Sequence, residues 1–444
     1  MALYLDSSLF RNVFSTPEMR AIFDDEHYFE TFMAVEAALA RAEADAGVIP
    51  EWAAEAITEK ATIEHLDIDR LETLIGETGH PAMSIIGAWK PAFDDAGEYI
   101  HWGATTQDIL DTTMVLQARE ALEIVRRELL DIRSKLAQIA ETHADTPMTG
   151  RTHFVHAVPM TFGMKVAVWV DEIDRHLDRL DAAMERSIAL QFFGAVGTLA
   201  SLGEPGREVQ ANLADELDLQ VPAVCWHAAR DRPAELVRVL AETAGTIGKI
   251  ARQVLFLNRP EVGEVTETPA DEHIGSSTMP HKINPKKAEL TVALSRLIRG
   301  QSAVMQEAMG MMDERDATNW YCEFAVIPSS FLYSSRMLAN AGRLVETLEI
   351  HPERMRENLD IYGALLASER IMMVLAEEIG RQTAHEIVSE AAQRSMTSEH
   401  SFADHLRADE RVTDALPEEQ LDSLLDPAEY VGLSASIAKS AITD

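Results

Sequence analysis

The chain has 444 residues, of which 46% are hydrophobic and 25% charged, as in an ordinary globular protein with a large core. Its 74 acidic and 39 basic side chains give a formal net charge of −35, which repels nucleic acid and anionic lipid. No apolar run reaches membrane-spanning length, and the first residues lack the pattern of an export signal. We therefore expect a cytoplasmic protein that binds neither nucleic acid nor membranes.

The two cysteines, Cys225 and Cys322, are too few for a disulfide framework and lack the spacing of metal ligands. We expect free thiols and no metal. The excess of acid leaves two hypotheses open: adaptation to a salty cytoplasm, where screening removes the self-repulsion, or simply an acidic enzyme.

Apolar side chains recur at helical spacing along most of the chain. The predicted helices cover about 28–46, 52–62, 113–145, 159–187, 236–257, 288–312 and 329–348, with shorter ones from 351 onward. No segment shows convincing strand alternation, and no short repeat is present. The pattern predicts an all-α, elongated helical bundle, and its large apolar faces favour oligomerisation.

Polar clusters lie at the breaks between these helices. Gly79 and Pro81 flank His80 and place it at a helix start or in a loop. The stretch HWGATTQD begins at His101 and precedes a long helix. Its two threonines, 105 and 106, either cap that helix or bind a ligand, and His101 is either a structural histidine or a binding residue.

Three further candidates have competing interpretations. His153 and His156 are three residues apart, but no nearby cysteine completes a metal set. Arg230 either forms salt bridges at a helix start or binds substrate. Arg315 lies in the segment 311–324, which we expect to be an ordered loop or a helix kink.

The most informative stretch is GSSTMPHKINP, residues 275–285. A glycine before two serines allows turn geometry, while Asn284 suits a helix N-cap with Pro285 at the first helical position. Lys282 adds a cation, and residues 281–287 contain three lysines and no acid. Such a positive island, next to a helix N-terminus, favours an anionic substrate.

This stretch closely resembles the GSSxMPxKxNP signature loop of the fumarase/aspartase superfamily. HWGATTQD and GRTHFVHAVPMTFG (150–163) precede it in the order of that superfamily's shared regions. The resemblance implies an all-helical subunit of three domains, at 1–103, 104–350 and 351–444. It also implies a central bundle of long helices and a homotetramer whose active sites take residues from three subunits.

The resemblance also implies roles for individual residues. Ser276 corresponds to the general base, Lys282 and Asn284 to the residues that hold a substrate carboxylate, and His153 to the general acid or its partner. The remaining residues are expected to bind substrate: His80, His101, Thr105, Thr106, Gln107, Ser277, Met279, Arg230 and Arg315. No cofactor and no metal are implied.

Two branches of the superfamily compete. Residues 14–23 and 226–232 resemble both adenylosuccinate lyases and 3-carboxy-cis,cis-muconate cycloisomerases. Val13 and Phe14 stand where adenylosuccinate lyases usually carry Arg-Tyr against the nucleotide phosphate, and Pro81 replaces their usual aspartate. The tail 425–432 is more similar to the cycloisomerases, whereas ERDAT (314–318) and the retained His153 are closer to the lyases.

A basic hydroxyl, a carboxylate clamp and an imidazole are the parts that β-elimination needs. The sequence therefore predicts β-elimination or addition on a small polycarboxylate, most similar to the cycloisomerase reaction. The alternative is adenylosuccinate lyase or another fumarate-releasing C–N lyase. A remote alternative is a helical scaffold without catalysis.

Overall fold

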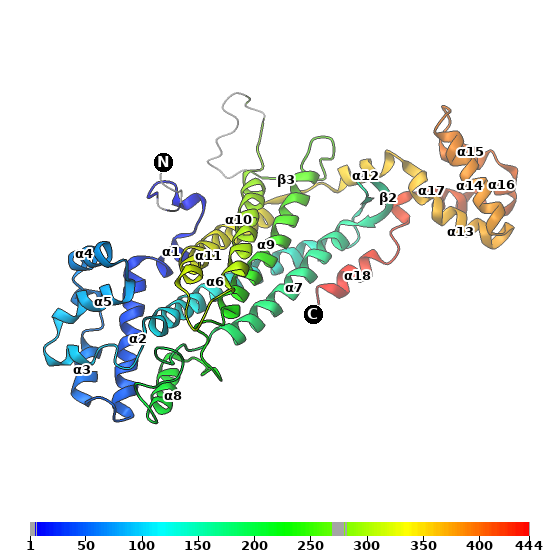
Figure 1. Cartoon of the computed structure of the whole chain (residues 1–444). Helices are drawn as coiled ribbons and strands as arrows, with labels where there is room; N and C mark the ends of the chain where they lie inside the picture. Colours follow the sequence, from blue (N-terminus) through cyan, green and yellow to red (C-terminus); the bar gives the residue numbers. More distant parts are fainter. Residues whose placement is uncertain (1–4, 6, 269–278, 280–281, 444) are drawn as a thin grey trace. The chain divides into compact units, whose positions relative to one another are not determined.

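The computed structural model describes residues 5, 7–268, 279 and 282–443 (Figure 1). The protein is all-α, as predicted, with four short strands among the described residues. None of the helices in this described part is both long and apolar enough to cross a membrane. Ser276 and Ser277 of the signature loop lie outside the described residues.

Contacts group the chain into two compact units, each assembled from three segments. The first unit comprises Met1–Leu130, His176–Gly248 and Thr291–Ala339, and the second comprises Asp131–Arg175, Lys249–Leu290 and Asn340–Asp444. Each unit has its own cluster of buried apolar side chains. The division into three domains at 103 and 350 stays a prediction.

In the first unit, short helices surround the buried helix α2. Their bounds are α1 Pro17–Ile22, α2 Asp25–Asp45, α3 Glu51–Glu59, α4 Ile68–Thr78, α5 Pro81–Trp89 and α8 Gly206–Leu217, with a 3₁₀ turn η1 at Arg11–Val13. His80 is the N-cap of α5 with Pro81 at the first helical position, which confirms that His80 lies at a helix start. Phe32 of α2 and Trp89 of α5 are fully buried in the core.

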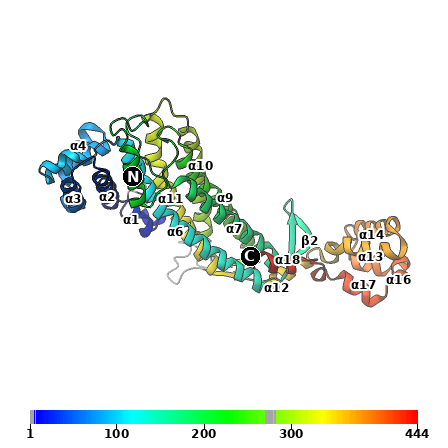
Figure 2. The same cartoon turned by 90° about the horizontal axis from the view of Figure 1, so that it is seen from below.

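Among the described residues that follow α5, five helices are longer than 20 residues (Figures 1 and 2). They are α6 Thr106–Thr142, α7 Phe162–Ser187, α9 Asp231–Leu257, α10 Lys286–Ala308 and α11 Ala317–Glu346. Within each unit, side-chain bonds join neighbours: Arg133 of α6 to Asp174 of α7, Lys249 of α9 to Glu172 of α7, and Gln301 of α10 to Ser329 of α11. All five correspond to predicted helices.

The starts of α7 and α11 differ from prediction for reasons that the structure shows. Helix α7 begins at Phe162 instead of 159, because residues 155–161 are paired in a hairpin. Helix α11 begins at Ala317 and contains Pro328, whereas a loop or kink was expected at 311–324 and a helix only from 329. Ile327 and Phe331 on either side of this proline are buried, and their packing offsets the hydrogen bond that proline cannot make.

The second unit holds the strands and the C-terminal helices. Strand β1 (Pro147–Thr152) pairs with β2 (Val155–Thr161), and β3 (Val265–Glu267) pairs with β4 (Leu348–Ile350), both antiparallel. The helices are α12 Pro352–Asp360, α13 Ser368–Ile379, α14 Arg381–Ser395, α15 Phe402–Arg407, α16 Glu410–Ala415, α17 Glu418–Leu425 and α18 Ser434–Ala441. These strands contradict the expectation of no strand structure. They were missed because each is only three to seven residues long and shows no clear alternation.

Candidate active site

The predicted site residues fall into two groups, one in each compact unit. His80, His101, Thr105, Thr106, Gln107, Arg230 and Arg315 belong to the first unit, and His153, Met279, Lys282 and Asn284 belong to the second. Ser276 and Ser277 belong to the undescribed part of the signature loop.

His101 is held by a buried carboxylate on α2. Its ring Nδ1 lies 2.6 Å from Oε1 of Glu36, and its backbone N–H donates to Oε2 of the same side chain over 3.1 Å. Its backbone is left-handed, with φ of 63°, which is uncommon for a residue with a Cβ. Burial alone would lower the pKa of His101, but the charge and hydrogen bond of Glu36, with a contribution from Asp108, outweigh burial and raise the pKa.

Asp108, in the first turn of α6, fixes the segment after His101. Its carboxylate accepts the backbone N–H groups of Thr105, Phe193 and Gly194 at 2.9–3.1 Å and lies 2.8 Å from Nε2 of His227. Asp108 and His227 are buried. Burial would lower the pKa of His227, but Asp108 raises it to about 9. The carboxylate thus ties three backbone segments together at the start of α6.

Gln107 and Arg315, both predicted to bind substrate, contact one another. The amide of the buried Gln107 donates to the carbonyl of His227 at 3.0 Å, and its oxygen accepts a hydrogen bond from Nε of Arg315 at 3.1 Å. Arg315 also donates to the carbonyl of Ala195 at 2.9 Å. The start of α6 and the segment before α11 therefore meet within the first unit, next to Asp108.

Arg230 is a fully buried arginine between two carboxylates. Its guanidinium donates to both oxygens of Asp111, to both oxygens of Glu323 and to the carbonyl of Trp226, so all five N–H donors have partners. It also stacks on the Trp226 ring, 4.9 Å from the centroid. The geometry fits the salt-bridge alternative. Substrate binding by Arg230 stays a prediction, and no donor is left over to support it.

His80 and the two threonines occupy helix starts. Nδ1 of His80 accepts the backbone N–H of Met83 at 3.3 Å, and the side chain is exposed. Thr106 is the first residue of α6, and the carbonyl of Thr105 accepts the N–H of Asp108 at 2.9 Å. The Thr105 N–H also donates to the Asp108 carboxylate, and this bond is one half of a capping box.

His153 lies at the tip of the β1–β2 hairpin in the second unit. His153 and Phe154 form its two-residue turn with φ of 49° and 68°, the left-handed pair that usually selects Asn-Gly. Both side chains are exposed, and Phe154 is 96% exposed. The hairpin also bulges at Gly150, where a Cβ would lie 2.4 Å from the carbonyl oxygen of Val158. Glycine is therefore required there.

The hairpin is anchored close to its tip by an ion pair with a buried carboxylate. Arg151, two residues before His153, donates with both terminal nitrogens to Glu264, at 2.5 and 2.9 Å. Glu264 is fully buried and also accepts the amide of Asn358 at 2.8 Å. The hairpin is therefore held just before the exposed turn that carries His153.

The described end of the signature loop exposes Lys282. Its backbone N–H donates to the carbonyl of Met279 at 3.0 Å, and no described carboxylate forms an ion pair with its side chain. Asn284 is half-buried. Helix α10 begins at Lys286, one residue later than the prediction that placed Pro285 at the first helical position.

The N-terminus of α10 is already occupied by an anion of the chain itself. Glu267 accepts the backbone N–H of Lys287 at 3.0 Å and that of Ala288 at 3.1 Å, and Nζ of Lys287 lies 3.8 Å from the same carboxylate. Glu267 thus takes two N–H groups of this helix start and lies near one lysine of the positive island. Binding of an anionic substrate by residues 281–287 stays a prediction. Of the described residues in that stretch, Lys282 is the exposed cation best suited to the role.

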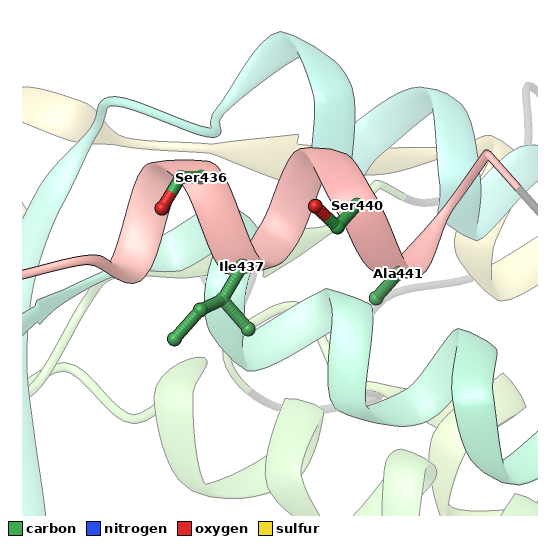
Figure 3. Close-up of a pocket in the computed structure, with 4 residues that line it drawn as sticks. All are labelled: Ser436, Ile437, Ser440 and Ala441. Carbon is green, nitrogen blue, oxygen red and sulfur yellow. The ribbon is translucent and has the colours of Figure 1, made fainter.

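Two other hollows, both formed by described residues of the second unit, provide no unpaired acid or base for catalysis. The pocket in Figure 3 is lined by Ser436, Ile437, Ser440 and Ala441 of α18, none of which is an acid or a base. A larger hollow between α12 and α15 contains Arg356, but this arginine is paired with Asp426 at 2.6 Å. We therefore keep the candidate site with the two groups above.

Comparison with known proteins decides the family. A family model described as lyase matches residues 11–300, and a second, described as adenylosuccinate lyase C-terminus, matches 364–441. The chain belongs to the fumarase/aspartase superfamily of lyases. It is thus an enzyme of the superfamily in which lyases and cycloisomerases share one fold.

Relatives of this lyase carry different activities. It is 39% identical to N-acetyl-S-(2-succino)cysteine lyase from Enterococcus italicus, over 97% of this chain and 95% of that protein. It is 38% identical to adenylosuccinate lyase from Methanocaldococcus jannaschii, over 97% and 94%. The crystal structure of 3-carboxy-cis,cis-muconate lactonizing enzyme from Pseudomonas putida matches with a TM-score of 0.92 and 36% identity, over 98% of each chain.

Several residues that shape this lyase's site were missed from the sequence. Glu36, His227 and Glu267 each contact a predicted residue or its helix, yet their partners lie between 20 and 119 positions away. Nothing in the local sequence marks His227 or Glu267 as partners of these residues. Glu36 offered one hint, because it is a charged residue on the apolar face of a predicted helix.

Proposed function

We propose that this lyase catalyses β-elimination, or the reverse addition, on a small polycarboxylate that carries no nucleotide. Ser276 removes a proton from the carbon next to a carboxylate, and the developing negative charge spreads into that carboxylate. Lys282 and Asn284 hold the carboxylate, and His153 protonates the leaving group. Membership of the superfamily, together with retention of all four residue types, carries this proposal.

The exposure of two of these side chains supports the proposal. Lys282 is exposed and has no carboxylate partner among the described residues, so it has a charge to offer an anion. His153 is exposed on a two-residue turn whose backbone conformation is costly for residues with a Cβ. We propose that a second copy of the chain covers this tip and completes the site, in a homotetramer.

Residues 13 and 14 occupy the positions that contact the nucleotide phosphate in adenylosuccinate lyases, and their chemistry favours a substrate without a phosphate. Val13, in η1, is 40% exposed, and the ring of Phe14 packs edge-on against Tyr333 with centroids 6.2 Å apart. Neither supplies the charge that an Arg-Tyr pair brings to a phosphate. We therefore rank adenylosuccinate below smaller polycarboxylates as a substrate.

The first reaction to test is cyclisation of 3-carboxy-cis,cis-muconate. A carboxylate oxygen of the substrate forms a C–O bond to one carbon of a double bond, and the neighbouring carbon takes a proton. This is elimination run backwards within one molecule. The resemblance of the tail 425–432 and the Pseudomonas putida structure support this choice.

A second candidate is fumarate release from an S-succinyl thioether. In that reaction a C–H proton and a thiolate leave neighbouring carbons, the C–S bond breaks, and the thiolate is protonated. The Enterococcus italicus relative is named for such a substrate, and its similarity spans 95% of its own length. The same base and clamp serve both reactions.

A substrate panel tests the proposal. Purified enzyme is given 3-carboxy-cis,cis-muconate, N-acetyl-S-(2-succino)cysteine, adenylosuccinate and argininosuccinate, with ultraviolet absorbance following loss of the muconate or release of fumarate. We expect turnover of one of the first two and weak or no turnover of adenylosuccinate. Efficient adenylosuccinate cleavage would overturn the exclusion of nucleotides. No turnover of any polycarboxylate would favour the scaffold alternative.

A further inference from the structure

Glu36 is a buried carboxylate whose side-chain hydrogen bonds, among the described residues, both go to His101. It lies in the middle of α2 with only 2% of its surface exposed, among the apolar side chains of the first unit's core. One oxygen contacts the His101 ring and the other accepts the His101 backbone N–H. A carboxylate in such a place costs several kcal/mol unless it is paired with a positive charge and hydrogen-bonded.

This arrangement orients His101 from two sides. Glu36 grips the ring through Nδ1 and the main chain through the N–H, so one side chain fixes both the ring and the left-handed backbone with φ of 63°. The opposite ring nitrogen, Nε2, has no hydrogen-bond partner among the described residues, and 13% of the side chain is exposed. The ring therefore has one anchored nitrogen and one that is available.

We infer that Glu36 is a positioning residue that keeps the His101 imidazole charged and directs its Nε2–H toward an anionic substrate. A carboxylate next to Nδ1 accepts the Nδ1–H and fixes the ring orientation, and its negative charge favours the doubly protonated imidazole, in which Nε2–H is also a donor. The inference deepens the proposed function and rests on it, because it assigns His101 to the binding of a substrate carboxylate.

Two other carboxyl groups, those of Asp108 and Glu43, lie near Glu36 and His101 and affect which groups are charged. Asp108 on α6 also favours the charged form of His101. Glu43, two turns after Glu36 on α2, is fully buried, and neither of its oxygens has a partner among the described residues. Burial and the charge of Glu36 raise the pKa of Glu43 to about 9, so Glu43 is neutral at pH 7. Of these two glutamates, Glu36 is the one that contacts His101.

The sign of the pH effect follows from the raised pKa of His101. The charged imidazole persists to higher pH than that of an ordinary histidine, and substrate binding weakens as the pH rises through its pKa. Replacing Glu36 by a neutral amide removes the stabilising charge. The pH at which binding weakens then moves down.

The experiment compares Glu36→Gln with Glu43→Gln in the full-length enzyme. Binding of tricarballylate, a polycarboxylate that does not react, is measured by calorimetry from pH 5.5 to 9, and kcat and KM are measured over the same range with the best substrate of the panel. We expect Glu36→Gln to weaken tricarballylate binding at pH 7.5 by about tenfold or more and to shift its pH profile downward. KM should change more than kcat.

The matched control separates positioning from general damage to the core. Glu43→Gln replaces a neutral carboxyl by an amide at an equally buried position of the same helix, and it should leave the pH profile unchanged. In a His101→Asn background, adding Glu36→Gln should cause little further loss, because Glu36 acts through His101. Glu36→Asp keeps the charge and should restore part of the profile.

Three results would overturn the inference. One is a Glu36→Gln enzyme with the wild-type pH profile and only a lower melting temperature. Another is a Glu43→Gln profile that shifts equally, and the third is full additivity with His101→Asn. The tricarballylate measurement needs no turnover, so it stands even if every substrate of the panel is refused, in which case the proposed reaction fails and the positioning role survives.

Discussion

His101 and His153 are two histidines with the same unusual backbone and opposite surroundings. Both have left-handed φ values, 63° and 49°. His101 is clamped by the buried Glu36, whereas His153 is exposed at a hairpin tip beside a 96% exposed phenylalanine. The first histidine is oriented by a carboxylate of its own unit. For the second, we propose that another copy of the chain supplies the contacts.

The same contrast holds for the charges. In the first unit, Arg230 and Asp108 are buried and fully bonded, which suits a rigid frame. In the second unit, Glu264 binds the hairpin next to its tip and Glu267 binds the start of α10, while Lys282 is left exposed. Lys282 and His153, which we propose to meet substrate, are both exposed.

The largest expected effect is at the proposed base. Ser276→Ala should lower kcat by roughly 10³-fold or more, the scale of a general base, with little change in melting temperature. The control is Thr278→Val in the same loop, which should keep most of the activity. A Ser276→Ala enzyme with near-normal kcat would contradict the assignment of the base.

On the framework side, the expected effect is on stability. Arg230→Met leaves Asp111 and Glu323 buried without their partner and should lower the free energy of unfolding by about 3–5 kcal/mol, measured by urea denaturation. Arg238 makes exposed ion pairs with Glu235 and Glu242, so Arg238→Met should cost under about 1 kcal/mol. Equal losses in the two variants would mean that burial of Arg230 adds nothing.

The smallest predicted effect concerns the hairpin tip. Phe154→Gly relieves a left-handed residue and should raise the free energy of unfolding by about 1 kcal/mol, measured by urea denaturation. Val155, the next residue and also exposed, lies in β2, where glycine should instead cost about 0.5–1 kcal/mol. The prediction fails if both substitutions destabilise alike. In that case Phe154 makes contacts that outweigh its backbone cost.

The sequence predicted the helices and the family well, because both signals are local. Apolar spacing along α6 and α9 covers many turns, and the loop around Ser276 concentrates rare residue types in eleven positions. The start of α7 was wrong because Pro159 is typical of a helix start but here belongs to β2, whose pairing with β1 is not visible in a seven-residue strand.

The partners of the site residues were not predictable in the same way. Glu36 and His101 are 65 positions apart, and Arg230 lies 119 positions from Asp111. Such pairs depend on how helices pack, which a pattern within one helix does not contain. The contact of Glu267 with the start of α10 was not predicted either. Glu267 belongs to a three-residue strand, which is too short to be recognised from its sequence.

The central claim is that the enzyme makes or breaks a C–H bond next to a carboxylate. The most direct measurement is to run the addition in D₂O, with the substrate that the panel identifies, and to locate the label by NMR. We predict one deuterium, on the carbon adjacent to the carboxylate, and loss of this incorporation in Ser276→Ala. Product formed with no deuterium at that carbon would contradict the account.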